Sequence, residues 1–310
     1  MSDAIARAEA ILRNRCGERV RTSFSLAPLT TFRIGGPAAL FVAPDGKQDL
    51  LAASEAIRET DVPFLVLGKG SNVLVDDAGF SGLVLRLGRG YRWSARDGER
   101  LMAGGAMPLP ALAGVALNEA LSGLEFGIAI PGSVGGAIRM NAGAHGSDIA
   151  AVVEAVSVFD LSAGTERTIP VVEAGFRYRN TDLPADSVVV AATVRLRPDA
   201  VSEIRARMDE IREWRRRTQP VAEANCGSVF KNPPNDSAGR LIDAAGLKGF
   251  AVGGASVSRK HANFVIAGPG ATAADVRSLI RHVRETVAAR TGIRLEPEVY
   301  LVGDLDPASR

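Results

Sequence analysis

The amino-acid sequence predicts an α+β protein built in two parts, and three observations support this prediction. Short β-rich runs separated by glycine dominate the chain up to about residue 200. Two long segments with helical periodicity follow, at residues 202–220 and 274–292. The length of 310 residues also exceeds what one compact hydrophobic core usually holds. We therefore expect a boundary near residues 199–203, where the β-rich runs give way to a charged segment with helical periodicity.

The expected elements follow from local patterns along the chain. An amphipathic helix with interleaved charges is expected at residues 1–20, and a second helix at 107–123 ends at a glycine. The helix expected at 202–220 is densely charged and stops at a proline. Strands are expected where β-branched and aromatic residues cluster between turn signals, at 38–44, 62–68, 72–77, 82–88, 152–160, 187–198 and around 295–303.

Composition and charge exclude several classes of protein. The chain has 37 Lys and Arg against 35 Asp and Glu, a formal net charge of +2, whereas a general nucleic-acid coat needs a large basic excess. No segment has the apolar run of a membrane span or a secretion signal, so we expect a cytoplasmic protein. Cys16 and Cys226 lie too far apart in sequence to suggest a disulfide framework. The histidines are isolated and predict no metal site: His145, His261 and His282.

The stretch VLGKGSNVLVDD places glycines directly after a strand, at Gly68 and Gly70. A Rossmann turn needs a third glycine and a following helix, but the residues that follow are strand-like. A Walker loop is excluded because Lys69 precedes the Gly-Ser pair. With Ser71, the glycines leave successive backbone N–H groups bare, and such a nest can bind a pyrophosphate. A tight hairpin is the alternative interpretation.

A second glycine-rich stretch, GIAIPGSVGGAIRMNAGAHG, covers residues 127–146. Pro131 ends the preceding segment, and Ser133 is expected to cap a helix that runs to Met140. The two adjacent glycines inside that helix cost about 1 kcal/mol each relative to alanine. They therefore indicate that a flat ring, or a phosphate at the helix start, approaches the backbone closely, unless they only allow close helix packing. Two such loops in one β-rich part make a dinucleotide ligand the favoured interpretation.

Polar residues outside these loops form the third group of candidates. Ser228 lacks the Gly-x-Ser-x-Gly pattern of a nucleophile elbow, and only the fold could bring His261 to it as a base. Hydrolase chemistry is therefore disfavoured. Each of the other candidates also has a structural explanation as a surface or turn residue: Arg177, Arg179, Lys231, Asn232, Glu296 and Glu298. Without any comparison to a known family, the sequence therefore supports an α+β protein that binds a dinucleotide.

Taken together, the motifs resemble one family, the UDP-N-acetylenolpyruvoylglucosamine reductases of peptidoglycan synthesis. The resemblance covers nearly the whole chain in one order. It runs through TTFRIGGPA, LGKGSNVLVDDAGFSGLVLRL, GLEFGIAIPGSVGGAIRMNAGAHG, FRYRNT, NCGSVFKNPP, SAGRLIDAAGLKG, GGASVSRKHANFV and LEPEVYLVG. It implies the FAD-binding fold of the vanillyl-alcohol-oxidase (PCMH-type) flavoproteins at residues 21–200, in two subdomains. A helix at 1–20 would precede it, and an α+β substrate domain would follow at 201–310.

The resemblance also implies the cofactors. FAD would be bound, with NADPH as cosubstrate, and no histidine near residues 67–72 is available for covalent attachment, so the FAD would be noncovalent. The matching motifs assign cofactor contacts to Gly68, Lys69, Gly70, Ser71, Asn72, Pro131, Gly132, Ser133, Gly136, Asn141 and Gly143.

In this family, NADPH reduces FAD, and the reduced flavin transfers a hydride to the enolpyruvyl ether of UDP-N-acetylglucosamine, giving UDP-N-acetylmuramate. The matching positions imply that Ser228 protonates the resulting carbanion while Arg179 and Glu298 stabilise the enol form. Substrate contacts are assigned to Lys231 and Asn232, and we expect Lys231 to be the cation beside Ser228. The arginine run could supply a diphosphate ligand or end as a solvated helix: Arg215, Arg216 and Arg217.

This chain departs from the family pattern in two places. The interval from Arg179 to Ser228 matches the shorter subclass, which lacks an inserted loop with a substrate-contacting tyrosine. FRYRNT has Arg177 where a small residue is usual and Thr181 in place of serine, and the Tyr-Arg order favours Arg179 over Arg177 as the catalytic arginine.

Two other functions stay open at this point. A flavin oxidase on the same fold is one, although the resemblance of the C-terminal part argues against it. A non-catalytic nucleotide-binding protein is the other. For the favoured reductase we expect a small-molecule substrate, no nucleic-acid or membrane partner, and a monomer.

Overall fold

The computed structural model of this protein describes residues 3–303. The chain divides into two compact units, each assembled from three separate stretches. Unit 1 consists of Met1–Thr22, Ala39–Lys69 and Gly82–Trp214, and unit 2 consists of Ser23–Ala38, Gly70–Ser81 and Arg215–Arg310. No helix of the described part is long and apolar enough to cross a membrane.

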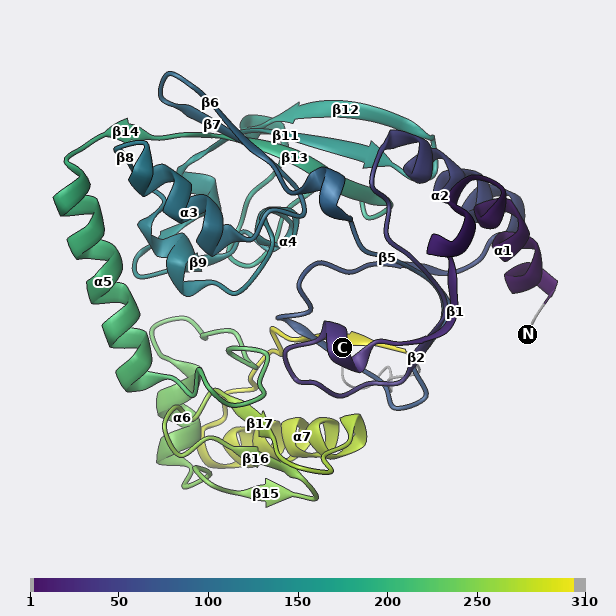
Figure 1. The fold of residues 1–310 in the computed structure, drawn as a ribbon. Coiled ribbons are helices and arrows are strands. Elements are labelled where there is room, and N and C mark those ends of the chain that lie inside the picture. The colour runs from purple at the N-terminus through teal and green to yellow at the C-terminus, as the bar shows by residue number, and fades with distance from the viewer. Residues whose placement is uncertain (1–2, 304–310) are drawn as a thin grey trace. The chain divides into compact units, whose positions relative to one another are not determined.

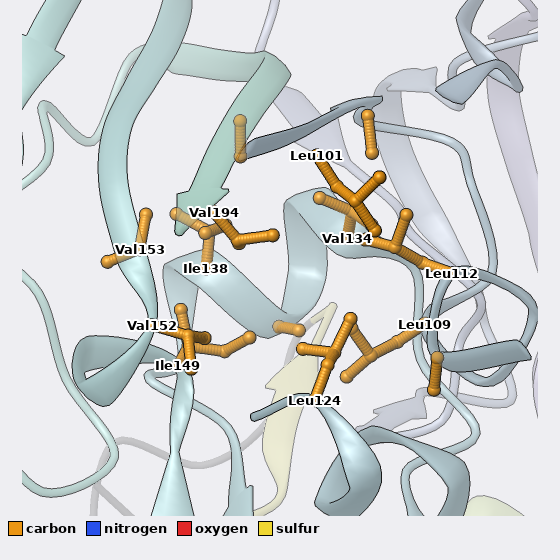
Figure 2. Packing of buried hydrophobic residues seen from close by; sticks show 14 of the residues in the cluster. Leu101, Leu109, Leu112, Leu124, Val134, Ile138, Ile149, Val152, Val153 and Val194 are labelled. Atoms are coloured by element: carbon orange, nitrogen blue, oxygen red, sulfur yellow. The ribbon is translucent and has the colours of Figure 1, made fainter. Parts of the chain in front are cut away.

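Unit 1 contains a five-stranded antiparallel sheet in the order β12-β11-β13-β7-β6. Two helices, α3 and α4, lie on one face of this sheet (Figure 1). Figure 2 shows the core between them, where Leu112 and Val134 lie close to Leu101 of β7, and Ile138 lies beside Val194 of β13. The bounds are β6 (Ser94–Asp97), β7 (Arg100–Gly104), α3 (Leu109–Asn118), α4 (Val134–Arg139), β11 (Val153–Asp160), β12 (Thr165–Pro170) and β13 (Ser187–Arg195).

A second layer of unit 1 is formed by α1 and α2, which pack side by side (Figure 1). Their buried faces share one apolar cluster with Leu83 and Leu85 of β5 and with Phe159 of β11. β5 belongs to a four-stranded sheet in the order β1-β2-β5-β3, in which β3 and β5 run parallel. The bounds are α1 (Asp3–Cys16), β1 (Arg21–Ser25), β2 (Pro37–Val42), α2 (Lys47–Thr60), β3 (Phe64–Val66) and β5 (Phe80–Leu85).

Unit 2 is a small α+β assembly. A parallel pair joins β4 to β18, and a three-stranded antiparallel sheet has the order β15-β16-β17. Its longest helix, α7, begins with a capping box of Thr272 and Asp275 and ends at Gly292 in the left-handed conformation. The bounds are β4 (Val73–Val75), α6 (Ala238–Ala244), β15 (Ala251–Val252), β16 (Ala255–Val257), β17 (Val265–Ala267), α7 (Ala273–Thr291) and β18 (Tyr300–Val302).

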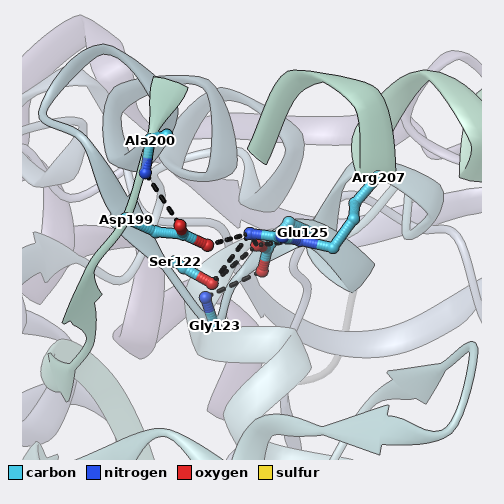
Figure 3. Close-up of polar contacts among 6 residues, drawn as sticks. All are labelled: Ser122, Gly123, Glu125, Asp199, Ala200 and Arg207. Carbon is cyan, nitrogen blue, oxygen red and sulfur yellow. Dashed lines mark hydrogen bonds and ion pairs between the residues drawn. The ribbon is translucent and has the colours of Figure 1, made fainter. Parts of the chain in front are cut away.

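Helix α5 (Val201–Thr218) begins in unit 1, and a polar cluster anchors its first half there (Figure 3). The Arg207 guanidinium donates to Glu125 Oε1 at 3.0 Å and to Asp199 Oδ2 at 2.5 Å. Burial opposes the charge of Glu125, but hydrogen bonds from the Gly123 N–H, the Ser122 hydroxyl and Arg207 hold the pKa of this carboxyl below its usual value. The ion pairs therefore tie α5 to the segment around Glu125.

The division into units differs from the single boundary expected near residues 199–203. Ile204 and Met208 of α5 are buried in the core of unit 1, so the helix belongs to that unit until Trp214. The change of sequence texture marks the start of a helix and not the end of a compact unit.

Most of the predicted elements are confirmed. The charged helix expected at 202–220 is α5, and the helix expected at 274–292 is α7. The helix expected at 107–123 was predicted too long, because Ala120 takes a left-handed φ of 55° and the chain then forms β8 (Leu121–Ser122). This strand pairs with β14 (Arg197–Pro198), so tertiary contacts override the helical pattern. The closing strand is short, covering Tyr300–Val302.

Candidate active site

In unit 1, the two glycine-rich stretches of the sequence touch each other. Gly68 follows Leu67, whose N–H donates to the Leu85 carbonyl at the end of β5 at 2.8 Å. A Cβ at Gly68 would lie 2.9 Å from Ser133 Oγ, so a larger residue there would displace the Ser133 side chain. Ser133 caps α4 as predicted, because its side chain accepts the Gly136 N–H at 3.3 Å. The approach places the start of the first loop against the turn that begins α4.

The backbone N–H groups of these segments show where an anion could bind. Those of Val134 and Gly135 donate to the carbonyls of Met107 and Gly105, and the Gly136 N–H is taken by Ser133. Four other backbone N–H groups have no acceptor within residues 3–303. They are those of Gly68 and Lys69 in the first loop and of Gly132 and Ser133 in the second. The first turn of α4 is therefore used internally, and the turn before it is the part with bare donors. This donor set fits a pyrophosphate such as that of FAD.

Gly70 and Asn72 continue the first loop into unit 2. Gly70 has a left-handed φ of 65°, and a Cβ there would lie 2.1 Å from the Leu29 carbonyl oxygen, so glycine is required. Asn72 Nδ2 donates to the Glu298 carbonyl at 3.0 Å, and the Asn72 carbonyl accepts the Tyr300 N–H at 3.0 Å. Sequence reasoning treated Asn72 only as a cofactor residue and missed this contact.

Asn141 and Gly143 both make contacts that stabilise unit 1. The buried Asn141 amide donates to Asp148 and to the Arg177 carbonyl, each at 3.1 Å, and accepts the Ala150 N–H at 3.0 Å. Gly143 lies in the hairpin of β9 (Gly143–Ala144) and β10 (Ser147–Asp148), where a Cβ would meet Asp148 at 2.7 Å. The Asn141 side chain is thus occupied by protein, and a cofactor contact there stays a prediction.

Arg179 occupies the corner of a tight turn in unit 1. Arg177 and Asn180 exchange both backbone hydrogen bonds, at 2.9 and 3.1 Å, with Tyr178 and Arg179 between them. Arg179 has a left-handed φ of 56°, a conformation that non-glycine residues rarely adopt and that often marks a functional site. Its guanidinium lies 5.0 Å from the centre of the Tyr178 ring and donates to the Gly143 carbonyl at 3.1 Å.

Arg177, the alternative catalytic arginine, has a different environment. Its guanidinium forms a two-pronged ion pair with the Asp182 carboxylate, including an Nη1–Oδ2 contact of 2.7 Å. This hydrogen bond raises the pKa of Arg177 and lowers that of Asp182. Asp182 thus holds the Arg177 side chain in its own loop, and the choice of Arg179 as the catalytic arginine stays a prediction.

In unit 2, main-chain hydrogen bonds bring the Ser228 and Glu298 segments together. Ser228 forms a bridge with Phe264, and the next N–H, that of Val229, donates to Asn263 at 2.9 Å. On the other side, the Glu298 N–H donates to the Val229 carbonyl at 2.7 Å. The segments that carry the two predicted catalytic residues of this unit are therefore joined through Val229, the residue that follows Ser228.

A buried asparagine reinforces the Ser228 segment. Asn263 is 3% exposed, and its amide both accepts the Phe230 N–H at 3.0 Å and donates to the Phe230 carbonyl at 2.8 Å. Both main-chain groups of a residue two positions after Ser228 are thus satisfied by one side chain. Asn263 lies in the motif GGASVSRKHANFV, but no local signal reveals this pairing.

The two predicted substrate residues also have protein partners in unit 2. Lys231 Nζ lies 2.5 Å from Glu296 Oε1, and the Lys231 N–H donates to the Glu296 carbonyl at 2.9 Å. Asn232 Oδ1 accepts the Ala238 N–H at 3.0 Å, at the start of α6. Glu296 is thus the nearest described counter-ion of Lys231, a partner that sequence reasoning did not assign.

Burial shifts the pKa of several groups near the Ser228 segment. Burial, followed by the negative charge of Glu298, raises the pKa of the Cys226 thiol, so this cysteine is a protonated packing residue. Burial lowers the pKa of His261, whose Nδ1 accepts the Asn263 N–H at 3.3 Å. Burial also lowers the pKa of Arg215, whose Nε donates to Gln219 at 2.9 Å. The Arg216 carbonyl accepts the Lys260 ammonium at 2.6 Å.

Comparisons with known proteins identify the family. The family model described as the FAD binding domain matches residues 38–169, and that of the UDP-N-acetylenolpyruvoylglucosamine reductase C-terminal domain matches 219–302. The reductase of that name from Anaeromyxobacter sp. (strain Fw109-5) is 47% identical over 97% of this chain and 94% of that protein. This chain belongs to the UDP-N-acetylenolpyruvoylglucosamine reductase family. UDP-N-acetylenolpyruvoylglucosamine reductase 2 from Symbiobacterium thermophilum is 45% identical over 98% of both chains.

Solved structures agree with this family. The crystal structure of the UDP-N-acetylenolpyruvylglucosamine reductase from Thermus caldophilus has a TM-score of 0.81 and 37% identity, covering 92% of this chain and 99% of that one. A berberine bridge enzyme in complex with (S)-reticuline shares the fold with a TM-score of 0.50 and 15% identity, over 64% of this chain and 45% of that one.

Family membership confirms the predicted fold class and the predicted enzyme class, a flavin-dependent reductase of peptidoglycan precursor synthesis that uses FAD and NADPH. The non-catalytic nucleotide-binding protein and the alcohol-oxidising flavoprotein are not supported, because the substrate domain matches the reductase family. The roles of single residues are a separate question.

Proposed function

We propose that this chain reduces the enolpyruvyl ether of UDP-N-acetylglucosamine to UDP-N-acetylmuramate, with Ser228 as proton donor and with Arg179 and Glu298 stabilising the enol form. The observation that carries the proposal is the ladder in unit 2, in which the Glu298 N–H donates to the Val229 carbonyl at 2.7 Å. It fixes the Glu298 main chain against the residue that follows Ser228, and a protonation step needs groups that are held in place in this way.

Unit 1 supplies a site that suits FAD. The bare N–H groups of Gly68, Lys69, Gly132 and Ser133 form the donor set, and the glycine at 68 permits the two turns to touch. When bound and reduced by NADPH, FAD supplies a hydride to the substrate. Pro131 and Gly136 of unit 1 are proposed as further cofactor contacts, and the motifs imply the same role for Gly70 and Ser71.

The chain's own residues handle the charge and the proton. A hydride that adds to the CH₂ carbon pushes the double-bond electrons onto the carbon beside the carboxylate, which becomes an enediolate. Arg179 is proposed to bind the carboxylate oxygens with its planar fork, where charge grows in the transition state. Ser228 Oγ then gives its proton to the carbanion, and a proton from solvent restores the hydroxyl.

Lys231 and Asn232 are proposed as substrate contacts. The Lys231 ammonium, held by Glu296, is the candidate cation that makes the transient Ser228 alkoxide tolerable. Arg215 is half-buried and is the member of the arginine run that we propose for the substrate diphosphate, because a partly desolvated guanidinium binds phosphate strongly.

Location and assembly are proposed at the same level. A cytoplasmic location is supported by the reaction itself, which consumes NADPH and a nucleotide sugar, and by the free state of both cysteines. A monomer is proposed and is tested by light scattering of the purified protein. No nucleic-acid partner is proposed, because the formal net charge is only +2.

The test compares the two half-reactions in native protein and in Ser228→Ala. We expect flavin absorbance in the purified protein and NADPH oxidation that depends on the added enolpyruvyl ether. Ser228→Ala should reduce flavin at the native rate but lose substrate reduction by on the order of 10²- to 10⁴-fold. Native turnover of the enolpyruvyl ether by the variant would exclude Ser228 as the proton donor. Loss of flavin reduction as well would instead reveal a folding or binding defect.

A further inference from the structure

Arg139, the last residue of α4, is a half-buried arginine that no role in the reaction accounts for. Its Nη1 donates to the carbonyls of Leu183 and Pro184, both at 2.9 Å. Its Nη2 donates to the Ser187 carbonyl at 2.5 Å and to the Ser187 hydroxyl at 3.1 Å. Burial is the only cause that shifts the pKa of Arg139, and it lowers it, so no carboxylate among the described residues offsets the charge.

The four acceptors follow the Arg179 turn: two are carbonyls of the loop after it, and two belong to Ser187, the first residue of β13. The Arg139 carbonyl adds a fifth link to this loop, because it accepts the Thr181 hydroxyl at 3.0 Å. A buried charge without a counter-ion is costly, whereas an apolar side chain could fill the same space. The retained guanidinium is explained by its geometry, since a rigid planar fork can bind several carbonyls at fixed positions and a lysine cannot.

The other side of the Arg179 turn is held by the same helix. α4 ends in a Schellman motif, in which the Ala142 N–H donates to the Ala137 carbonyl at 2.9 Å and Asn141 is left-handed with a φ of 39°. From this position the Asn141 amide donates to the Arg177 carbonyl at 3.1 Å. Residues at the end of one short helix thus bind the chain on both sides of the turn. Asn141 binds it before Tyr178, and Arg139 binds it after Asn180.

Apart from these side-chain hydrogen bonds, the loop between residues 171–173 and β13 has few stabilising contacts from regular secondary structure. Its internal main-chain bonds include those of the Arg177–Asn180 turn, the Asp182 N–H to Ala174 and the Ser187 N–H to Pro184. A catalytic side chain on such a loop needs support from neighbouring side chains to keep its position.

We propose that Arg139 is a positioning residue for Arg179: it holds the Tyr178–Arg179 turn in place through the carbonyls of Leu183, Pro184 and Ser187. The inference rests on the proposed function of Arg179. Arg139 touches neither substrate nor cofactor in this role, and α4 connects the start of the cofactor turn at Ser133 to the catalytic turn at its other end.

The test measures the two half-reactions of Arg139→Met in the FAD-loaded protein. Reoxidation of reduced flavin by the enolpyruvyl ether should slow by about 10- to 100-fold, the effect of a misplacement of about 1 Å. Reduction of the flavin by NADPH should stay at the native rate, because it does not use Arg179. Arg139→Lys should not restore the loss. Arg195→Met is the matched control, since Arg195 is an exposed arginine bound to Glu154 at 3.0 Å.

A double-mutant cycle separates positioning from general stabilisation. Arg139→Met in an Arg179→Ala background should cause no further slowing, because residues that act through one another are not additive. A second readout needs no turnover: trypsin should cut native protein slowly at Arg177 and Arg179 and cut Arg139→Met faster there, with other sites unchanged. Additive effects, or equal slowing of both half-reactions, would overturn the proposal.

Two further outcomes have defined meanings. If Arg139→Met does not fold, Arg139→Gln decides, since it keeps a polar side chain but loses the planar fork, and it should slow reoxidation in the same direction. A native reoxidation rate in that variant would then refute the proposal. If Arg179→Ala itself reoxidises at the native rate, the proposed role of Arg179 fails and the role of Arg139 falls with it. If Arg179→Ala is slow while Arg139→Met is native, only the role of Arg139 is refuted.

Discussion

The turn that carries Arg179 and the segments that carry Ser228 and Glu298 are held in different ways. Arg179 lies in a left-handed conformation on an irregular loop, and its surroundings are fixed mainly by side chains, those of Arg139 and Asn141. Ser228 forms an isolated bridge with Phe264, and the Glu298 N–H donates to the Val229 carbonyl, so main-chain hydrogen bonds between neighbouring segments fix them. Where main-chain hydrogen bonds fix a segment, several residues contribute to its position. Where side-chain hydrogen bonds fix it, the position depends on a few residues. Unit 2 should therefore tolerate the loss of a side chain that only supports its backbone better than the Arg179 turn tolerates the loss of Arg139 or Asn141.

The largest expected change in activity comes from Lys231, and it is compared with that of Arg177, since each region has one such ion pair. Lys231→Met should raise the KM for the enolpyruvyl ether about 10- to 100-fold, the value of a charged hydrogen bond to substrate. Arg177→Met is the matched change in the other region, and it should leave turnover near native, because exposed ion pairs contribute little. Steady-state kinetics of both variants check this. A larger loss in Arg177→Met than in an Arg179 variant would reverse the assignment of the catalytic arginine.

A middle-sized effect is expected from Asn72→Ala. The variant loses the donor to the Glu298 carbonyl, but Glu298 keeps its N–H bond to Val229, so substrate-driven flavin reoxidation should slow only about 3- to 10-fold. FAD content should be native, since the Asn72 side chain points to protein. Asn118→Ala, an exposed change at the end of α3, is the control. Loss of FAD with an unchanged reoxidation rate in the loaded fraction would show that the Asn72 side chain serves the cofactor instead.

The smallest effect is a pH dependence confined to the Ser228 side. Burial lowers the pKa of His261 from its ordinary 6.5, so the unfolded chain binds a proton that the folded chain resists. Stability is therefore lost as the pH falls below that ordinary value. From about pH 8 to about pH 5, the melting temperature of native protein should fall more steeply than that of His261→Gln. Parallel curves would remove His261 as the cause. Arg139, which stays charged throughout this range, should add no such dependence.

Patterns within one stretch of sequence predicted much of the fold and part of the site. The Ser133 cap, the bounds of α5 and α7 and the glycine-rich turns follow from local rules of capping, periodicity and backbone freedom. The left-handed Ala120 and the strand that ends the α3 region could not be predicted locally, because pairing with Pro198 decides them.

Supporting contacts were the least predictable part of the site. Lys231 and Glu296 are 65 residues apart, and Arg139 lies 44 to 48 residues before the carbonyls it binds. Nothing in the sequence distinguishes Arg139 from a surface arginine, since its acceptors are main-chain groups that every residue has. Family resemblance supplied the predicted reacting residues, but only the fold shows which contacts hold them.

The hydrogen bond from Asn72 to the Glu298 carbonyl joins residues 226 positions apart, and β4 pairs with β18 over a similar interval. During synthesis on the ribosome, β4 emerges long before its partner strand exists. Contacts of such large sequence separation form slowly, because a long loop must close before any bond rewards it. The main-chain bonds that hold Glu298 are therefore formed late, and the newly made chain cannot acquire its complete set of proposed catalytic residues until Glu298 itself has been translated.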